Sequence, residues 1–169
     1  MKKFMKKVAG LGMAAVMALS MSAMAFAQDA PGYVTFFKSG SATEVSMTQN
    51  TIGSYASKVQ VVDGEDVNYV YTINLQSFTM TKMGISGEGQ MTGIVLGSAA
   101  QADGITAVLA DDLQTLVVTV PADLVDSNGN SATYAAEAQA EVELFWGITF
   151  DMPSSINLAI TNSQLTYSE

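Results

Sequence analysis

Residues 58–75 read K-V-Q-V-V-D-G-E-D-V-N-Y-V-Y-T-I-N-L, and this stretch decides the fold class of the chain. Two runs rich in β-branched and aromatic residues flank the turn sequence Asp63-Gly64-Glu65-Asp66, the pattern of two strands joined by a tight turn. Asp-Gly is a strong hairpin signal, because glycine accepts the positive φ that such a turn needs. The sequence therefore predicts a β-hairpin with strands at 58–62 and 67–75.

The second of these strands alternates between apolar and polar side chains, which is typical of a sheet with one buried face and one face in water. The predicted buried face carries Val67, Tyr69, Tyr71, Ile73 and Leu75, and the predicted wet face carries Asn68, Thr72, Asn74 and Gln76.

Further strands are predicted at 33–37, 105–109, 116–120, 148–152 and 156–160, the last two being separated by Pro153-Ser154-Ser155. Four glycines between Gly84 and Gly93 predict a loop with only a short strand at 91–96, because glycine weakens strands. Segment 134–146 alternates like a strand but is also rich in the helix formers Ala and Glu. A strand is favoured, because Glu137 and Glu141 would repel each other one helical turn apart.

Many short strands at this spacing predict an all-β fold, an antiparallel β-sandwich of the immunoglobulin-like kind. We expect one such domain over residues 28–169, with a short helical lip.

Residues 1–27 have the form of a cleaved signal peptide. Four lysines precede an apolar run at 8–24, and Ala25-Phe26-Ala27 has the small residues that signal peptidase requires before a cut at Gln28. A transmembrane anchor is the alternative, but no positively charged flank follows the apolar run. The sequence predicts a secreted protein, extracellular or held at the cell surface by non-covalent contacts, with no membrane insertion after cleavage.

Beyond residue 27 the chain is strongly acidic. Three lysines and no arginine stand against 16 acidic residues, a net charge of −13. Nucleic acids and anionic lipids are excluded as partners, because binding phosphate requires clustered Lys and Arg. The absence of Cys and His removes thiol nucleophiles, Ser-His triads and zinc-histidine sites. The sequence therefore predicts a protein that is not an enzyme.

The segment before the hairpin, residues 41–52, is polar and contains one methionine; we call it the lip. Val45, Thr48 and Ile52 recur at helical spacing, and Gly53 would end a short helical turn. A flexible lip beside a stiff hairpin is a common way to form a binding groove. The candidate ligand-binding residues are Ser46, Met47, Tyr69 and Tyr71.

Ser46-Met47 within T-E-V-S-M-T-Q-N, followed by the hairpin, resembles part of the near-iron-transporter (NEAT) family, which are secreted immunoglobulin-like sandwiches that bind haem for iron uptake. The resemblance implies haem as a ligand, with the Ser-Met segment closing over its distal face. The family's iron ligand is the first Tyr of a Y-x-x-x-Y motif, which this chain lacks. Iron would then require Met47, Met80, Met83 or another Tyr.

A second candidate is a calcium loop formed by Asp126, Asn128, Asn130 and Glu137, whose oxygens follow the spacing of loop positions one, three, five and twelve. The alternative is a plain turn, because L-V-D-S-N-G-N resembles the L-x-D-x-x-G-N strand connection of bacterial immunoglobulin-like domains.

Together these patterns predict a secreted bacterial binding module with a lip-and-hairpin groove, for haem or another small-molecule ligand. The alternative is a structural or adhesive immunoglobulin-like domain of the cell envelope that binds a protein or a glycan.

Overall fold

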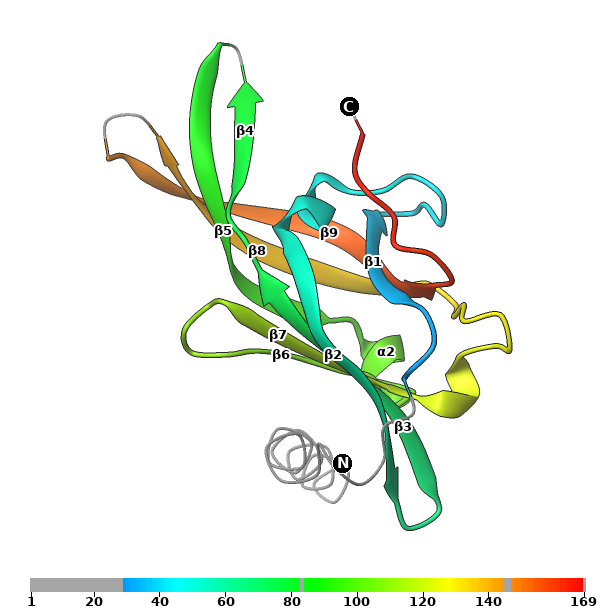
Figure 1. The fold of residues 1–169 in the computed structure, drawn as a ribbon. Coiled ribbons are helices and arrows are strands. Elements are labelled where there is room, and N and C mark those ends of the chain that lie inside the picture. Colours follow the sequence, from blue (N-terminus) through cyan, green and yellow to red (C-terminus); the bar gives the residue numbers. More distant parts are fainter. Residues whose placement is uncertain (1–28, 83, 145–146, 169) are drawn as a thin grey trace.

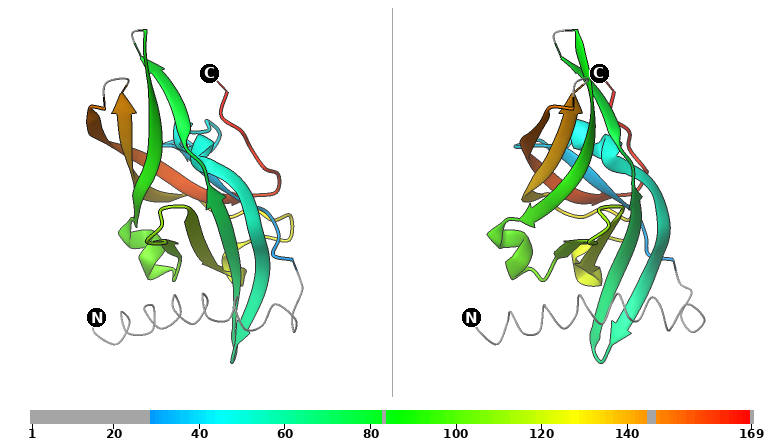
Figure 2. Two further views of the ribbon diagram at one scale, coloured as in Figure 1. Left: turned by 60° about the vertical axis from the view of Figure 1, so that its left-hand side comes forward. Right: turned by 90° about the vertical axis from the view of Figure 1, so that its left-hand side faces the viewer.

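A computed structural model describes residues 29–82, 84–144 and 147–168 (Figure 1). The predicted signal peptide at 1–27 and the end of the predicted strand 134–146 lie outside the described residues. The described chain forms two antiparallel sheets that face each other (Figure 2), so the prediction of an antiparallel all-β protein is confirmed.

The five-stranded sheet has the order β1-β9-β8-β5-β4, and the four-stranded sheet has the order β2-β3-β7-β6. The strands are β1 Tyr33–Lys38, β2 Ile52–Asp63, β3 Asp66–Leu75, β4 Phe78–Lys82, β5 Ile85–Leu96, β6 Thr106–Leu109, β7 Thr115–Pro121, β8 Tyr134–Leu144 and β9 Thr149–Thr161. Three short helical segments connect them, η1 Met47–Thr51, α2 Ser98–Ala102 and η2 Ala122–Leu124.

The predicted hairpin is confirmed as β2 and β3. Asp63 pairs with Asp66 across the turn, and Gly64 has the predicted positive φ of 64°. Tyr71 and Ile73 are fully buried between the sheets, as the alternation predicts. The opposite face of β3 is less wet than predicted, since Asn68 is only 7% exposed. The reason is the position of β3 between β2 and β7, whose side chains flank it on both faces.

Segment 134–144 is strand β8, which decides between the two conformations that the sequence left open. Ala136, Ala138 and Val142 are buried, while Glu137 and Glu141 are exposed on the other face. Tertiary packing accounts for this, because a strand between β5 and β9 turns its row of apolar side chains toward the core and leaves the acidic row in water.

The loop predicted around Gly84–Gly93 was wrong. Residues 85–96 form one continuous strand, β5, which pairs with β4 and with β8. The neighbouring strands supply the packing that glycine lacks: the ring of Phe78 lies over its cross-strand partner Gly89 and fills the space that a side chain there would occupy.

The break predicted at Pro153 was also wrong, because β9 runs unbroken from Thr149 to Thr161. Its pairing explains why the strand tolerates a proline. β1 pairs only with residues 156–161 of β9, so the first part of β9 is a sheet edge. A missing N–H costs little at such an edge.

The core lies between the two sheets and draws fully buried side chains from both. These include Val34, Phe36, Tyr71, Ile73, Met91, Leu116, Val118, Ile156, Leu158 and Ile160. The lip leaves β1 and returns to β2, so it passes from one sheet to the other.

Candidate functional site

The lip contains the predicted helical turn. Residues 47–51 form the 3₁₀ helix η1, and Ser46 caps its start: the Ser46 hydroxyl accepts a hydrogen bond from the Thr48 backbone N–H at 3.2 Å. Ser46 is buried, 6% exposed. This residue from the Ser-Met pair therefore has a local structural role, and it directs the following Met47 into η1.

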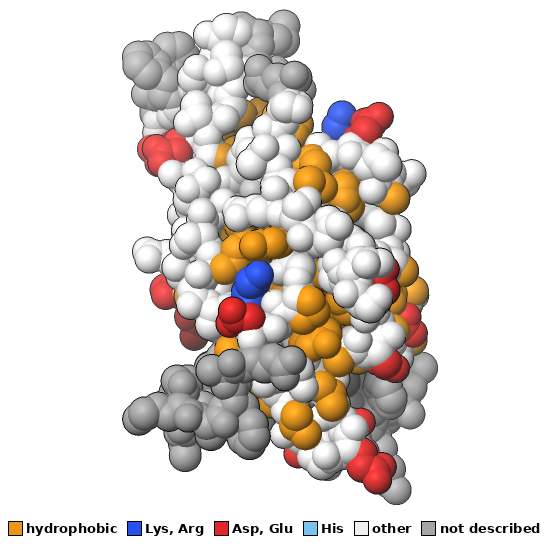
Figure 3. All heavy atoms as spheres, turned by 45° about the vertical axis from the view of Figure 1, so that its right-hand side comes forward, with side chains coloured by type: hydrophobic (Ala, Val, Ile, Leu, Met, Phe, Trp, Pro, Cys, Tyr) orange, Lys and Arg blue, Asp and Glu red, His pale blue; other side chains and the backbone are white. Residues whose placement is uncertain are grey.

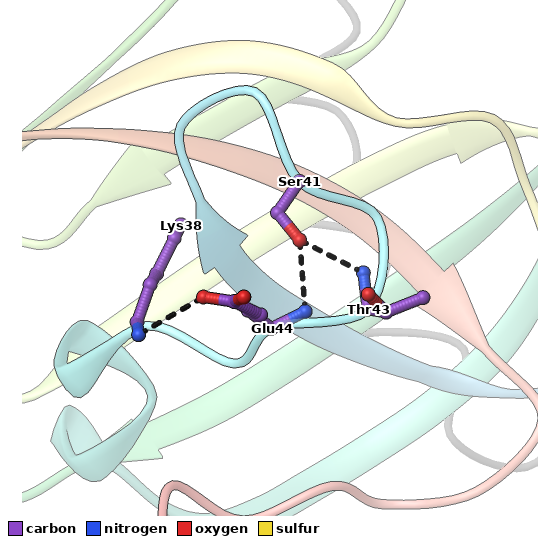
Figure 4. A network of polar contacts seen from close by, with 4 residues as sticks. All are labelled: Lys38, Ser41, Thr43 and Glu44. Carbon is purple, nitrogen blue, oxygen red and sulfur yellow. Dashed lines mark hydrogen bonds and ion pairs between the residues drawn. The ribbon is translucent and has the colours of Figure 1, made fainter.

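A polar network holds the start of the lip against β1 (Figure 4). The Ser41 hydroxyl accepts hydrogen bonds from the backbone N–H groups of Thr43 at 3.2 Å and Glu44 at 2.9 Å. Lys38 and Glu44 form an exposed ion pair at 3.1 Å. Such an exposed pair contributes about 0–1 kcal/mol, so the turn depends mainly on the serine.

Gln49 holds the middle of the lip in place, a structural role that the sequence did not predict. Its side-chain oxygen accepts a hydrogen bond from the Phe36 N–H at 2.8 Å, and its amide donates to the Leu165 carbonyl at 3.2 Å. The Ser46 N–H also donates to the Phe36 carbonyl at 2.8 Å. The lip therefore covers part of the free edge of β1. A lone Gln in a polar segment gives no signal of this role, because its partners are distant in sequence.

Beneath the lip lies a small pocket with a volume of about 40 Å³. It is lined from η1 by Met47, Thr48 and Thr51, and from the five-stranded sheet by Phe78, Met91, Ala138, Gln139, Ala140, Met152 and Ser154. A water molecule needs roughly 10–15 Å³ of such space, so the pocket accommodates a few atoms. The lip and the five-stranded sheet thus form a small, mainly apolar site.

Three methionines define the character of this pocket. Only five methionines follow residue 27, and Met47, Met91 and Met152 all line it. Met91 pairs with Ala140 on one side of β8, and Met152 pairs with the same Ala140 on the other. Directly opposed residues face the same side of a sheet, so the two methionines flank a small alanine and Met47 faces the row from the lip.

The other predicted ligand-binding residues lie elsewhere. Tyr69 and Tyr71 are on β3, in the other sheet, and neither lines the pocket. The Tyr71 hydroxyl donates to the Pro31 carbonyl at 2.6 Å, and the Tyr55 hydroxyl donates to the Val34 carbonyl at 2.9 Å. Burial raises the pKa of both phenols well above the ordinary value of 10. These tyrosines therefore bind β1 and the segment just before it to the other sheet.

Lys58 completes this pinning of the chain start. Its ammonium lies 3.8 Å from the centre of the Tyr33 ring and donates to the Gly32 carbonyl at 3.1 Å. The Ala30 N–H donates to the Lys58 carbonyl at 3.1 Å. On the face shown in Figure 3, few basic side chains are visible, and hydrophobic side chains are exposed among uncharged polar and backbone atoms. The positive charge of Lys58 therefore stabilises the start of the folded chain and does not form an anion-binding site.

Three of the four predicted calcium residues, Asp126, Asn128 and Asn130, form a hydrogen-bonded turn. One carboxylate oxygen of Asp126 accepts hydrogen bonds from the N–H groups of Asn128 at 2.8 Å and Asn130 at 3.0 Å. The Asn130 side-chain oxygen accepts from the Asn162 N–H at 3.0 Å, and Glu137 is exposed on β8. Within residues 29–82, 84–144 and 147–168, no three acidic, His or Cys side chains gather as a metal site. The arrangement is that of a strand connection.

Haem does not fit the pocket. Pockets for ligands of its size measure roughly 300–1,000 Å³, against about 40 Å³ here. In the part of the chain that the structure describes, no Tyr, His or Cys lines the pocket. Met80, another sulfur that the sequence suggested for iron, is not part of the lining, and Met83 lies outside the described residues.

No protein-family model, curated protein or solved structure matches this chain. Among the residues that the structure describes, no helix is both long enough and apolar enough to cross a membrane.

Proposed function

We propose that this chain is a secreted binding module that takes a ligand smaller than a porphyrin between its lip and its five-stranded sheet. One observation carries the proposal: Met47 of the lip lines the same pocket as Met91 and Met152 of the sheet. Segments distant in sequence thus enclose one site, and the site combines apolar walls with a few hydroxyl groups, the composition usual for ligand pockets.

Two features support placing the module among immunoglobulin-like sandwiches related in form to NEAT domains. A short helical lip follows the first strand and precedes a long hairpin, and the pocket lies under that lip. The departure from NEAT domains lies in the ligand, because the pocket is too small for haem and carries thioethers in place of a phenol.

Native mass spectrometry of the protein exported by an expressing bacterium tests the proposal. We expect part of the population to carry a small non-covalent adduct. The Ala140→Leu variant should carry none, since the larger side chain fills the space between the two methionines. A wild-type protein without any adduct would contradict the proposal. Hemin serves as a comparison, and its Soret band should stay unshifted.

An adhesive role is the second candidate, and a different observation favours it. β5 begins and β8 ends at the same end of the five-stranded sheet (Figure 1), where Gly87 pairs with Leu144. Ile85 at the start of β5, and Ile148 and Phe150 around the start of β9, are 53%, 57% and 39% exposed. In this version the Ile85→Ser and Ile148→Ser variants lose binding to the cell envelope, while Met47→Ala keeps it.

A further inference from the structure

The pocket under the lip offers a ligand an unusual set of groups. Among the described residues that line it there is no charged side chain, histidine or cysteine; its distinctive atoms are the three thioether sulfurs of Met47, Met91 and Met152. A thioether is a soft, polarisable sulfur that accepts hydrogen bonds only weakly. No carboxylate in the described part of the chain lines the pocket, and its oxygen donors are the neutral hydroxyls of threonine and serine and one glutamine amide, which leaves it without the negative charge that hard divalent cations favour.

We propose that Met47, Met91 and Met152 bind one soft monovalent cation of the Cu(I) and Ag(I) class, an inference that rests on the proposed function because it uses the same pocket. Thioether ligands select Cu(I) over the hard divalent metals. A volume of about 40 Å³ suits a bare ion and excludes a bulky organic ligand.

The register of the sheet supplies the geometry for two of the three ligands. Met91 and Met152 stand in one row on β5 and β9, with Ala140 of β8 between them. Neighbouring strands are about 4.7–4.9 Å apart, so two flexible methionine side chains can converge over the small alanine. Met47 comes from the opposite side, on the lip, and completes a three-sulfur set.

The surroundings favour a cation in this position. The acidic surface, with a net charge of −13 beyond residue 27, attracts positive ions. Burying an unpaired charge is costly, and here the three sulfurs replace the lost hydration. The ring of Phe78 also lines the pocket, and aromatic faces attract cations.

Methionine-methyl NMR tests the proposal directly. The exported and processed protein is labelled with ¹³C at its methionine methyl groups, which gives five resonances, and is titrated with silver nitrate in a chloride-free buffer. We expect the resonances of Met47, Met91 and Met152 to shift and to saturate at one equivalent of Ag(I). The resonance of Met80, outside the pocket, should stay in place.

Conservative variants provide the matched controls. Met47→Leu and Met152→Leu preserve side-chain volume, so we expect both to fold. Each removes a proposed ligand and should lower the Ag(I) affinity by at least about 10-fold, since losing even a group that only supports a ligand costs about 10- to 100-fold. Met80→Leu should bind as the wild type does. Met47 lies half-buried on the lip, so its variant tests the site even if replacement in the sheet disturbs folding.

Three outcomes would overturn the proposal: no shift at all, equal shifts of Met80 and the pocket residues, or unchanged Ag(I) affinity in the Met47→Leu variant. The two proposals fail separately. A small adduct in native mass spectrometry without Ag(I) binding retains the binding module and removes the soft cation. The absence of both removes the binding site altogether.

Discussion

The side-chain oxygen of Gln49 accepts a hydrogen bond from the Phe36 backbone N–H at 2.8 Å. Its amide nitrogen donates to the Leu165 carbonyl, so Gln49 links the lip to both β1 and the C-terminal segment. Phe36 belongs to β1, a strand that pairs with β9 on one side only. Unpaired edge groups invite association with other chains. The lip therefore covers the free edge of β1 and also forms one wall of the pocket.

Replacing Gln49 should loosen the lip. In Gln49→Leu the buried Phe36 N–H loses its acceptor, and we expect a loss of about 1–3 kcal/mol in the free energy of unfolding, the typical cost of an unsatisfied buried polar group. Urea denaturation measures the loss. Gln76→Leu is the control, because its amide bonds to the Asn50 carbonyl at an exposed position. Equal stability of the two variants would show that the hydrogen bonds of Gln49 do not stabilise the lip.

Gly89 should not tolerate a side chain while Phe78 is present. A Cβ at position 89 would lie within 2.6 Å of Phe78 Cε1, so Gly89→Ala should destabilise the fold by about 1–3 kcal/mol through overpacking. Thermal melting provides the measurement. In the Phe78→Leu background the same change should cost less. An additive double mutant would mean that the ring and the glycine do not interact.

Alkaline pH should destabilise the protein through Tyr55 and Tyr71. Burial raises the pKa of both in the fold above the ordinary value of 10 that they regain on unfolding. The unfolded state then loses protons first, so the stabilisation is complete below pH 10 and declines as the pH rises beyond it. Urea midpoints at pH 8 to 11 measure the decline. Tyr71→Phe should flatten it, and an identical decline in that variant would contradict the assignment.

Calcium should leave the melting temperature unchanged. The Asp126 carboxylate already accepts two backbone N–H groups, and a ligand raises stability only by binding the native state. Melting with millimolar calcium or with a chelator tests this point. Asp126→Asn keeps an acceptor oxygen and should remain near wild-type stability, while Asp126→Ala should lose about 1 kcal/mol. A calcium-dependent rise in the wild type would restore the metal loop.

The exported protein should begin at Gln28. Intact mass spectrometry of the purified chain measures this terminus directly. In the structure, the residues just after this predicted terminus are part of the fold: Ala30 is 1% exposed and Asp29 pairs with Val59. Ala30→Glu would place a charge at this buried position and should therefore destabilise the fold. The N-terminus found by mass spectrometry should stay at Gln28. An exported chain that retains residues 1–27 would contradict the predicted cleavage.

Local patterns were sufficient for most strands. The Asp63-Gly64 turn and the alternation in 67–75 and 134–144 predicted the strands that the structure contains. The errors fell where tertiary partners override local preference. Gly87 and Gly89 look like loop residues until Phe78 and Val142 pack against them, and Pro153 looks like a break until it is placed at a sheet edge.

Composition and a period of two residues are local properties, so the acidity beyond residue 27, the lack of Cys and His and the alternating strands follow from the order of residues alone. What Met47 faces, in contrast, depends on which strands pair and becomes visible only in the folded chain. Met91 and Met152 lie 61 residues apart, and the register of β5, β8 and β9 alone brings them into one row around Ala140. A pocket formed by such long-range pairing leaves no trace in the spacing of its residues.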